Sequence, residues 1–376
     1  MPAAVYLKVD CQQNSTRTMK KIHLYIIDSD ETVRQRVLDA TAADPEITIA
    51  ESEGPGNTDT TLEKLKSEKP DALLLGINEK FSAEMDLLIT IRENLPYLPI
   101  MVMASHNREG AEIALSALKK GAVEYFPKTS PLSSAILPVE YFETRVRPVI
   151  KAVPRLNRAV LLSSNHLEDA VNKITPIPGE FFSNSFSRME LVVIAGCLGG
   201  VASLYLLLAG LPGNLPVPVI VVQHAPDMLT NVLATDLDKI TALNVVEAKD
   251  GDKLLPGYVY IAPGDQHVTV RKSNQKMVIS LNRNNFVKGF RPSIDVLMKS
   301  VRKQYGNRVL SVFLSGGGND GIDGANVVDV IGGQIIIQNK QTSLLSDLTW
   351  KLEMMGLNEG SYPIERLAHE ISRRLI

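Results

Sequence analysis

Three residues that could act together in acyl transfer stand in the C-terminal half of the chain: Cys197, His224 and Asp320. Each follows a run of apolar residues that predicts a buried strand, and these runs span 191–195, 217–222 and 308–314. Because ligands of open parallel sheets bind beyond the carboxyl ends of the strands, we expect the three side chains to meet there. A thiol nucleophile, an imidazole base and an orienting carboxylate are the groups that acyl transfer requires. Taken singly, the same residues have structural interpretations, namely an inert buried thiol, a structural histidine and a turn-forming aspartate.

Backbone groups around this predicted site are suited to binding an oxyanion. The thiol stands at the beginning of a predicted helix over 199–210, where unpaired N–H groups and the helix dipole favour a thiolate. The N–H groups of Leu198, Gly199 and Gly200 are therefore expected to stabilise a tetrahedral intermediate. Gly318, in a second glycine-rich turn, is expected to let the backbone approach the substrate.

The N-terminal half alternates between strand and helix signals. Strands are predicted at 22–27, 47–50, 72–75, 100–103 and 123–126. Helical patterns separate them, and Asp30 is expected to cap the first helix. Five β/α units of this size predict a doubly wound parallel sheet over residues 20–130. Residues 1–19, which precede the first strand, are expected to be a disordered extension.

A second alternation of strands and helices occupies residues 189–376. Besides the three strands described above, a further strand is predicted at 334–337. Helices are predicted at 319–330, at 343–355 and from 364 onwards. The segment 254–270, LLPGYVYIAPGDQHVTV, has the pattern of a hairpin, and a further polar turn is predicted at 273–275. The prediction is therefore a second α/β domain with an antiparallel insertion.

Between the two halves, residues 131–188 are predicted to form a helix and a linker. This segment carries the basic residues Arg145, Arg147, Lys151, Arg155 and Arg158. Charge runs of this kind usually form solvated surface, which is the interpretation that we favour. The alternative is a basic patch that docks an acidic partner.

The overall composition excludes several classes of protein. The 376 residues include 40 Lys and Arg against 42 Asp and Glu, and a net charge of −2 lacks the signature of a nucleic-acid binder. With 44% hydrophobic and 22% charged residues, the chain is not an acidic disordered protein. Its two cysteines, Cys11 and Cys197, lie far apart, which excludes a disulfide scaffold and suits the reducing cytoplasm. No C-x-x-C or H-E-x-x-H motif occurs, so neither a metal site nor a cofactor is predicted.

One uncharged run, 191–211, is long enough to span a bilayer. Its first part is β-branched, Gly199 and Gly200 interrupt it, and its second part has a helical pattern. No cluster of Lys or Arg flanks it, as a cytoplasmic anchor would favour. We therefore predict a strand, a tight turn and a buried helix rather than a membrane span.

Several segments of the C-terminal half resemble, in order and spacing, the catalytic domain of the chemotaxis protein-glutamate methylesterase family (CheB). They read VVIAGCLGG, VIVVQHAP, DGDKLLPGYVYIAPGDQHV, RPSIDVL and LSGGGNDGIDG. Residues 20–130 resemble the response-regulator receiver domain that precedes the catalytic domain in this family. The resemblance implies a flavodoxin-like receiver sheet followed by a CheB-type methylesterase sheet with an antiparallel hairpin. It also implies hydrolysis of glutamyl methyl esters on methyl-accepting chemoreceptors, often with deamidation of receptor glutamines.

The catalytic motif of the family maps onto the predicted site with several changes. Its serine nucleophile, in G-A-S-T-G-G, corresponds to Cys197 in A-G-C-L-G-G, and its threonine corresponds to Leu198. His224 matches the general base, and Asp320 matches the carboxylate that orients it. The usual methionine of G-M-G-N-D-G is Gly317 here, so the resemblance implies a reshaped site with a thiol nucleophile.

The receiver half departs from its family at the phosphorylation site. Receivers hold Mg²⁺ with an acidic pair, phosphorylate an aspartate, and recognise the phosphate with a hydroxyl and a lysine. Here the acidic pair is reduced to Asp28, with Asp30 two positions later, and Lys128 keeps the lysine. The phosphoacceptor position holds Gly76 and the hydroxyl position holds Met103, so phosphorylation is not expected.

These observations lead to hypotheses from different classes. The first is a divergent methylesterase with a Cys-His-Asp triad that acts on chemoreceptors without control by phosphorylation. The alternative is a catalytically inactive scaffold that binds a chemoreceptor or a chemotaxis-type histidine kinase. A third hypothesis is a thiol hydrolase with a new substrate, because Gly317 and Leu198 reshape the pocket. Ester hydrolysis, tested together with modification of the thiol, separates the enzyme from the scaffold.

Overall fold

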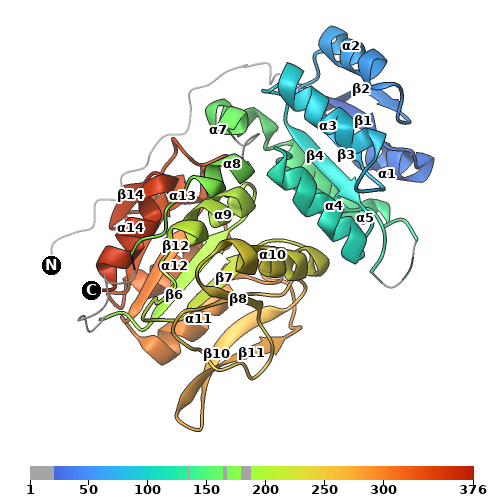
Figure 1. The fold of residues 1–376 in the computed structure, drawn as a ribbon. Coiled ribbons are helices and arrows are strands. Elements are labelled where there is room, and N and C mark those ends of the chain that lie inside the picture. The colour runs from blue at the N-terminus through green and yellow to red at the C-terminus, as the bar shows by residue number, and fades with distance from the viewer. Residues whose placement is uncertain (1–20, 132, 134, 164–166, 179–187) are drawn as a thin grey trace, which may run out of the picture.

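The computed structural model describes residues 21–131, 133, 135–163, 167–178 and 188–376. Two α/β domains lie next to each other, and a helical segment joins them (Figure 1). This architecture confirms the fold class predicted from the sequence. The expected disordered extension 1–19 lies outside the described residues.

Five parallel strands form the N-terminal sheet, in the order β2-β1-β3-β4-β5. They are β1 (Ile22–Ile27), β2 (Ile47–Glu53), β3 (Ala72–Gly76), β4 (Ile100–Ala104) and β5 (Glu124–Pro127). The helices are α1 (Glu31–Thr41), α2 (Thr58–Glu68), α3 (Ala83–Asn94) and α4 (Arg108–Lys119). The central strands β3 and β4 are wholly buried, as the apolar runs predict for strands covered on both faces. Asp30 caps α1 as predicted, because its carboxylate accepts the N–H groups of Thr32 and Val33.

Seven parallel strands form the C-terminal sheet, in the order β14-β13-β12-β6-β7-β9-β8. The strands are β6 (Leu191–Gly196), β7 (Val219–Gln223), β8 (Asn244–Glu247), β9 (Tyr258–Ile261), β12 (Val309–Phe313), β13 (Gln334–Gln338) and β14 (Gly360–Tyr362). The helices are α9 (Gly200–Gly210), α10 (Asp227–Ile240), α11 (Ile294–Tyr305), α12 (Ile322–Asp329), α13 (Asp347–Met354) and α14 (Ile364–Arg374). The three strands that were expected to carry the site, β6, β7 and β12, are neighbours at the centre of this sheet.

The predicted hairpin region is antiparallel only in its last part. Within 254–270, β9 joins the large sheet in parallel, whereas the antiparallel pair is β10 (His267–Ser273) with β11 (Lys276–Asn282), connected at the polar turn predicted at 273–275. Asn274 and Gln275 connect this pair with left-handed φ values of 45° and 64°. A two-residue turn with positive φ matches the twist of an antiparallel hairpin, so this turn sets the register.

The uncharged run 191–211 divides into β6 and α9, and both elements are almost entirely buried. No helix in the described part of the chain combines the length and the apolar character needed to cross a bilayer. The prediction of a strand, a turn and a buried helix is therefore confirmed.

The segment between the domains is largely helical. It contains α5 (Val139–Tyr141), the π-helix η1 (Phe142–Val146), α6 (Arg147–Ile150), the 3₁₀ helix η2 (Val153–Arg155), α7 (Arg158–Ser163) and α8 (Leu167–Asn172). Phe142, Val146 and Ile150 are buried against the N-terminal domain. Its short helices are therefore part of the folded core.

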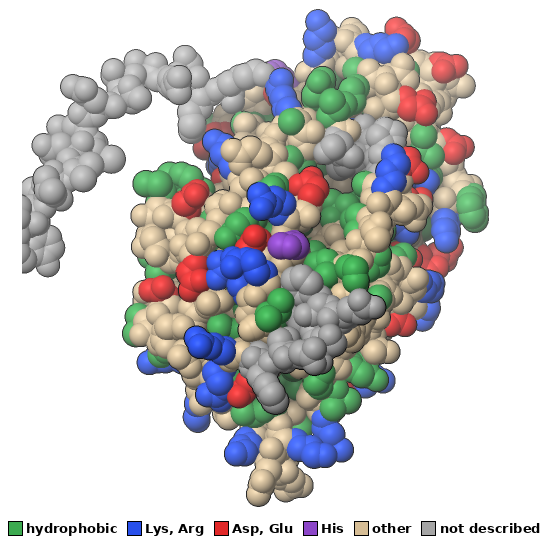
Figure 2. Space-filling view, turned by 60° about the vertical axis from the view of Figure 1, so that its left-hand side comes forward, with side chains coloured by type: hydrophobic (Ala, Val, Ile, Leu, Met, Phe, Trp, Pro, Cys, Tyr) green, Lys and Arg blue, Asp and Glu red, His purple; other side chains and the backbone are tan. Residues whose placement is uncertain are grey.

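Four of the five basic residues in this segment contact groups of the same chain. Arg147 donates to the carbonyl of Ala40 (2.9 Å), and Lys151 pairs with Asp44 (3.2 Å) and Glu46 (3.1 Å). Further pairs join Arg155 to Asp347 and Arg145 to two phenylalanine rings. The basic side chains are exposed or partly exposed, as a solvated face predicts, and their contacts also tie the segment to both domains. Elsewhere, acidic and basic side chains are interspersed over the face shown in Figure 2.

The two domains contact each other mainly through α4 and α10. His106 lies 2.5 Å from Asp227, and Lys119 pairs with Asp236 (3.1 Å). Apolar residues of both domains also belong to common clusters, one of which contains Leu198, Phe142 and Val146. The N-terminal domain is thereby held against the end of the C-terminal sheet where the predicted site lies.

Candidate active site

The three predicted residues follow adjacent strands of the C-terminal sheet. Cys197 follows β6, His224 follows β7, and Asp320 follows the glycine-rich turn after β12. The backbone N–H of Cys197 donates to the carbonyl of Ser315 (3.0 Å), and that of His224 donates to the carbonyl of Gly196 (3.0 Å). Nε2 of His224 lies 2.9 Å from Oδ2 of Asp320. Residues 96 positions apart in the chain are thus brought into direct contact.

Asp320 is buried and is held by several donors at the beginning of α11. Its Oδ1 accepts the hydroxyl of Ser293 (2.7 Å) and the N–H of Asp295 (3.2 Å), and its Oδ2 accepts the N–H of Ile294 (2.8 Å). Burial raises the pKa of Asp320, but the hydrogen bonds from His224, Ser293 and Ile294 outweigh burial and hold the pKa below its ordinary value. An ionised carboxylate only accepts hydrogen bonds, so Nε2 of His224 carries the proton in this pair.

The second ring nitrogen of His224, Nδ1, is free to exchange a proton with a nucleophile or substrate. Nδ1 is buried and has no hydrogen-bond partner among the described residues. Burial lowers the pKa of His224, but Asp320 and the Cys197 sulfur reverse this effect and raise the pKa to about 9. The ring of Phe290 stacks on the imidazole with centroids 3.8 Å apart and planes 9° apart. The imidazole is therefore fixed in orientation and protonated at neutral pH.

The turn after Cys197 depends on glycine. Gly199 has a φ of 77°, and a Cβ atom there would lie 2.7 Å from Cβ of Leu344. The N–H of Gly200 donates to the carbonyl of Cys197 (2.8 Å), so this N–H is occupied and does not face an oxyanion. The N–H groups of Leu198 and Gly199 make no hydrogen bond to any described residue. Of the N–H groups that were expected to bind an oxyanion, these two therefore remain available.

The glycine-rich turn before Asp320 lies directly against the thiol. A Cβ atom at Gly316 would lie 2.7 Å from Cβ of Cys197, so only glycine allows this approach. Gly318 has a φ of 88° and lines the cavity over the thiol together with Gly317. This position agrees with the predicted role of Gly318 as a turn residue at the site. Gly318 belongs to the turn after β12, and the N–H groups expected to bind the oxyanion belong to the turn after β6.

Sequence reasoning missed several side chains that shape the site. Nε2 of Gln223 donates to the carbonyl of Cys197 (2.9 Å), and its position directly before His224 was the available signal. Ser293 was contained in the RPSIDVL segment, but no local pattern indicated that its hydroxyl holds Asp320. Phe290 lies in an irregular stretch after β11, where periodicity carries no information. These contacts are long-range and arise from packing.

The N-terminal domain and the connecting segment cover the site. A cavity of about 670 Å³ is lined by Cys197, His224 and Phe290 on one side and by residues of β5, α5 and η1 on the other. Arg145 of η1 lies over the ring of Phe286 (5.4 Å) and that of Phe290 (5.9 Å). Cys197 is partly shielded under this cover. The thiol therefore faces a cavity that both domains line.

Comparison with known proteins identifies the family. The model of the CheB methylesterase family matches residues 192–371. The protein-glutamate methylesterase/protein-glutamine glutaminase of Symbiobacterium thermophilum is 30% identical over 367 residues, which cover 96% of this chain and 98% of that protein. The chain belongs to the CheB methylesterase family. The corresponding protein of Thermotoga maritima is 29% identical over 96% of this chain and 99% of its own length. The crystal structure of the Thermotoga maritima CheB catalytic domain is 33% identical, with a TM-score of 0.48, and covers 49% of this chain and 98% of that one.

In this CheB family member a buried ion pair, Asp28 with Lys128, fills the expected phosphorylation site of the N-terminal receiver domain. Asp28 is fully buried, and Nζ of Lys128 lies 3.2 Å from its Oδ2 and 2.6 Å from Oδ1 of Asn78. A Cβ atom at Gly76 would overlap the Asp28 carboxylate. Asp30 caps α1 and donates its own N–H to Asp28 (2.9 Å). The space beside Gly76 is therefore occupied by Asp28.

The receiver fold family implies a Mg²⁺ ion at this pocket, and the residues present do not fit one. Burial raises the pKa of Asp28 despite the opposing effect of Lys128, and both of its oxygens are engaged by Lys128. Among the described residues, no group of three or more His, Cys, Asp or Glu side chains could hold a metal ion.

Proposed function

We propose that this CheB family member hydrolyses γ-glutamyl methyl esters of chemoreceptors with Cys197 as nucleophile. His224 is the acid and base of this reaction, Asp320 orients it, and the N–H groups of Leu198 and Gly199 bind the oxyanion. Deamidation of receptor glutamines is the second reaction that the same groups support. The domains are 20–130, 131–188 and 189–376, and the protein acts in the cytoplasm. The relatives named above are called methylesterases and glutaminases, and they cover nearly the whole chain.

The observation that carries the proposal is the geometry around His224, which lies between Asp320 and the thiol-bearing turn. Its Nε2 lies 2.9 Å from Oδ2 of Asp320, and its buried Nδ1, which has no hydrogen-bond partner among the described residues, remains for the thiol. Its raised pKa, about 9, agrees with a protonated imidazole at neutral pH. A protonated imidazole is a poor base for a serine hydroxyl, but it stabilises a neighbouring thiolate. A protonated His224 is therefore consistent with a thiol nucleophile, Cys197, at the position where the family has serine.

The reaction proceeds in two steps. The Cys197 thiolate attacks the ester carbonyl carbon, and His224 gives its Nδ1 proton to the leaving oxygen, so that methanol departs and a thioester forms. Water then attacks the thioester while Nδ1 takes one of its protons. Collapse of the tetrahedral intermediate breaks the C–S bond and releases the product as the glutamic acid, which loses its proton to bulk water, and the Cys197 thiolate and protonated His224 are restored. Asp320 remains ionised throughout and keeps the ring in place.

Control by phosphorylation is absent in this proposal. Gly76 has no side-chain oxygen that could attack a phosphoryl group, and the adjacent space holds Asp28. Lys128, which recognises the phosphate in phosphorylated receivers, is paired with Asp28 and Asn78. We infer that the receiver domain regulates or positions the catalytic domain without a phosphoryl group.

The test is release of methanol from a methylated chemoreceptor by the full chain. Wild type and Cys11→Ser are expected to release methanol, whereas Cys197→Ala and His224→Gln are expected to release none. Cys11→Ser is the matched control because it removes the other cysteine of the sequence. Equal release by wild type and Cys197→Ala would disprove the catalytic role of Cys197.

The alternative is an inactive scaffold that binds a chemoreceptor or a histidine kinase. Leu198, at the position of the family's threonine, is 3% exposed and packs in an apolar cluster that includes receiver residues. This packing favours an arrangement in which the receiver domain stays against the catalytic domain. A scaffold without turnover would tolerate such an arrangement. Receptor binding without methanol release by wild type would support the scaffold.

A further inference from the structure

Three basic side chains gather on one side of the β10–β11 hairpin. Arg271 of β10 stands opposite Val278 of β11, and Lys253, from the segment before β9, stands opposite Val278 on its other edge. Lys276 precedes Val278 by two positions and therefore points to the same side. The alternate residue Val270 is buried in the core, so the side with the three cations faces solvent. We call Lys253, Arg271 and Lys276 the hairpin face.

The hairpin face is accessible and has no acidic partner among the described residues. All three residues are exposed. The hairpin projects from the catalytic domain away from the receiver domain (Figure 1), and Lys and Arg side chains lie on both sides of this lower end in Figure 2. Other cations of the catalytic domain form ion pairs, such as Lys288 with Asp295 (2.8 Å) and Arg308 with Glu190 (2.6 Å). The charge of the hairpin face is left for an external group.

Two acidic residues stand in the neighbouring segment, and their hydrogen bonds go to the backbone. Asp250 accepts the N–H of Leu281 (2.9 Å), and Asp252 accepts the N–H of Lys249 (2.8 Å). The three cations, in contrast, are cross-strand or diagonal neighbours, and diagonal neighbours on a sheet lie about 7 Å apart. Like charges this close lower stability. Their retention on one face indicates a partner of negative charge.

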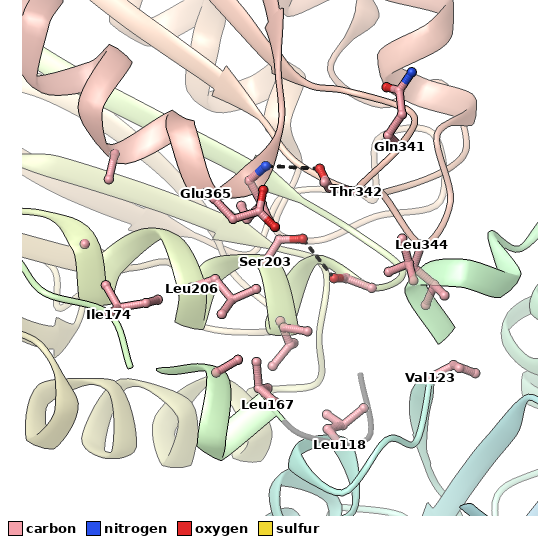
Figure 3. Close-up of a pocket in the computed structure, with 18 of the residues that line it drawn as sticks. Leu118, Val123, Leu167, Ile174, Ser203, Leu206, Gln341, Thr342, Leu344 and Glu365 are labelled. Carbon is pink, nitrogen blue, oxygen red and sulfur yellow. Dashed lines mark hydrogen bonds between the residues drawn. The ribbon is translucent and has the colours of Figure 1, made fainter. Parts of the chain in front are cut away.

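The interior offers no comparable site for such a partner. The cavity of about 450 Å³ in Figure 3 is lined mainly by apolar residues such as Leu118, Leu206 and Leu344, and the described residues that line it include no Lys or Arg. The arginines that line the larger cavity contact Asp265, Asp347 and two phenylalanine rings. The hairpin face differs from both cavities, because its cations are unpaired and open to solvent.

We propose that the hairpin face docks a carboxylate-rich surface of the chemoreceptor. This inference rests on the proposed function, in which each reaction turns a neutral ester or amide of the receptor into a carboxylate. β10 begins at His267, whose Nδ1 accepts the N–H of Ser293 (3.2 Å), the residue that holds Asp320. From His267 to Arg271 the strand extends about 14 Å, which an α-helix covers in about nine residues. A receptor segment of moderate length therefore reaches from the site to the hairpin face.

The residues around the face favour an acidic protein over other polyanions. Residues 249–255 and 271–277 include no aromatic side chain on which nucleic-acid bases could stack. Segments that bind membranes combine basic residues with Trp, Phe and Leu that enter the bilayer. Here the tip of the hairpin is formed by the polar residues Asn274 and Gln275, and Leu255 is the one large apolar residue of these two segments that is strongly exposed.

The experiment measures binding of the full chain to the cytoplasmic fragment of a chemoreceptor. The fragment carries glutamate at its modification positions, so that no reaction takes place during the measurement. The hairpin variant combines Lys253→Gln, Arg271→Gln and Lys276→Gln. Exposed ion pairs change an equilibrium constant about twofold each. We therefore expect the hairpin variant to bind about tenfold more weakly than wild type at about 50 mM salt, and equally at about 500 mM salt, where the charges are screened.

The matched control removes the same three charges from scattered positions. It combines Lys173→Gln, Lys239→Gln and Lys340→Gln, which lie after α8, in α10 and after β13 and are all exposed. We expect this control to bind the fragment like wild type. Both variants are expected to hydrolyse a small methyl ester at the wild-type rate, because none of the six residues lines the cavity over the thiol. On the methylated receptor, the hairpin variant is expected to raise KM about tenfold and to leave kcat unchanged.

The outcomes separate the docking surface from the proposed function. Equal binding by wild type and the hairpin variant at low salt, or no binding by wild type, overturns the docking surface, whether or not methanol is released. A loss that the scattered control shares also overturns it, since net charge would then be responsible. Binding to phosphatidylglycerol vesicles that the hairpin variant alone loses, with receptor binding unchanged, assigns the face to a membrane and overturns the proposal. Weaker receptor binding by the hairpin variant alone supports it, even if wild type releases no methanol and the proposed function fails.

Discussion

The protonation of His224 makes the stability of the catalytic domain depend on pH in a predictable direction. The pKa of His224 is raised from 6.5 to about 9, mainly by Asp320 and Cys197 acting against burial. A group whose pKa is raised on folding contributes stability at pH values below its unfolded pKa. This contribution is lost as the pH rises through the folded pKa. The relevant window for His224 is therefore pH 6.5 to 9.

The size of the effect follows from the same shift. A rise of about 2.5 pKa units corresponds to about 3 kcal/mol at about 1.4 kcal/mol per unit. The side chain of His224 is 6% exposed, so screening by solvent reduces this value little. The free energy of unfolding of wild type, relative to His224→Gln, is expected to fall by about 3 kcal/mol from pH 6 to pH 9.5.

The assay is urea unfolding at a series of pH values, followed by the fluorescence of Trp350. This residue lies in α13 and is the only tryptophan of the sequence, so its signal reports the catalytic domain. His23→Gln is the control, because His23 is exposed on β1 of the receiver domain. A difference between wild type and His224→Gln that stays constant or grows with pH would refute the reasoning. In that case, Asp320 and Cys197 would not stabilise a protonated imidazole.

Three further predictions concern the site and the receiver pocket. Gly76→Asp is expected to cost about 1–3 kcal/mol of stability, because its Cβ overlaps the Asp28 carboxylate, and to leave the protein unlabelled by acetyl phosphate with Mg²⁺. Stoichiometric labelling at unchanged stability would contradict this. Gly199→Ala is expected to destabilise the protein by about 1–3 kcal/mol more than Gly251→Ala in urea unfolding. Both glycines have positive φ, but only a Cβ at Gly199 meets neighbouring atoms, so equal losses would speak against the contact with Leu344. Phe290→Leu is expected to lower kcat/KM about tenfold without loss of fold, since the imidazole loses its stacking partner, and an unchanged value would show that stacking does not position His224.

Much of the fold could be predicted from local patterns. β1 begins and ends where its apolar run predicted, and the predicted ranges of β3 and β4 differ from the observed strands by one residue. Asp30 could be assigned as a cap because an N-cap acts within three residues of itself. The placement of Cys197, His224 and Asp320 at strand ends also followed from the chain, since parallel strands place their carboxyl ends on the same edge.

The tertiary structure decided what depends on contacts between distant segments. The polar turn at 273–275 was predicted, but the pairing of 254–270 was not, because β9 has parallel partners in β7 and β8 that no local pattern reveals. The basic residues of the connecting segment bind groups of both domains, and a charge run alone does not indicate its partners. The stacking of Phe290 on His224 likewise joins segments that are distant in the chain. Apolar periodicity is a property of a few neighbouring residues, whereas strand order and domain contacts are determined by the packing of the whole chain.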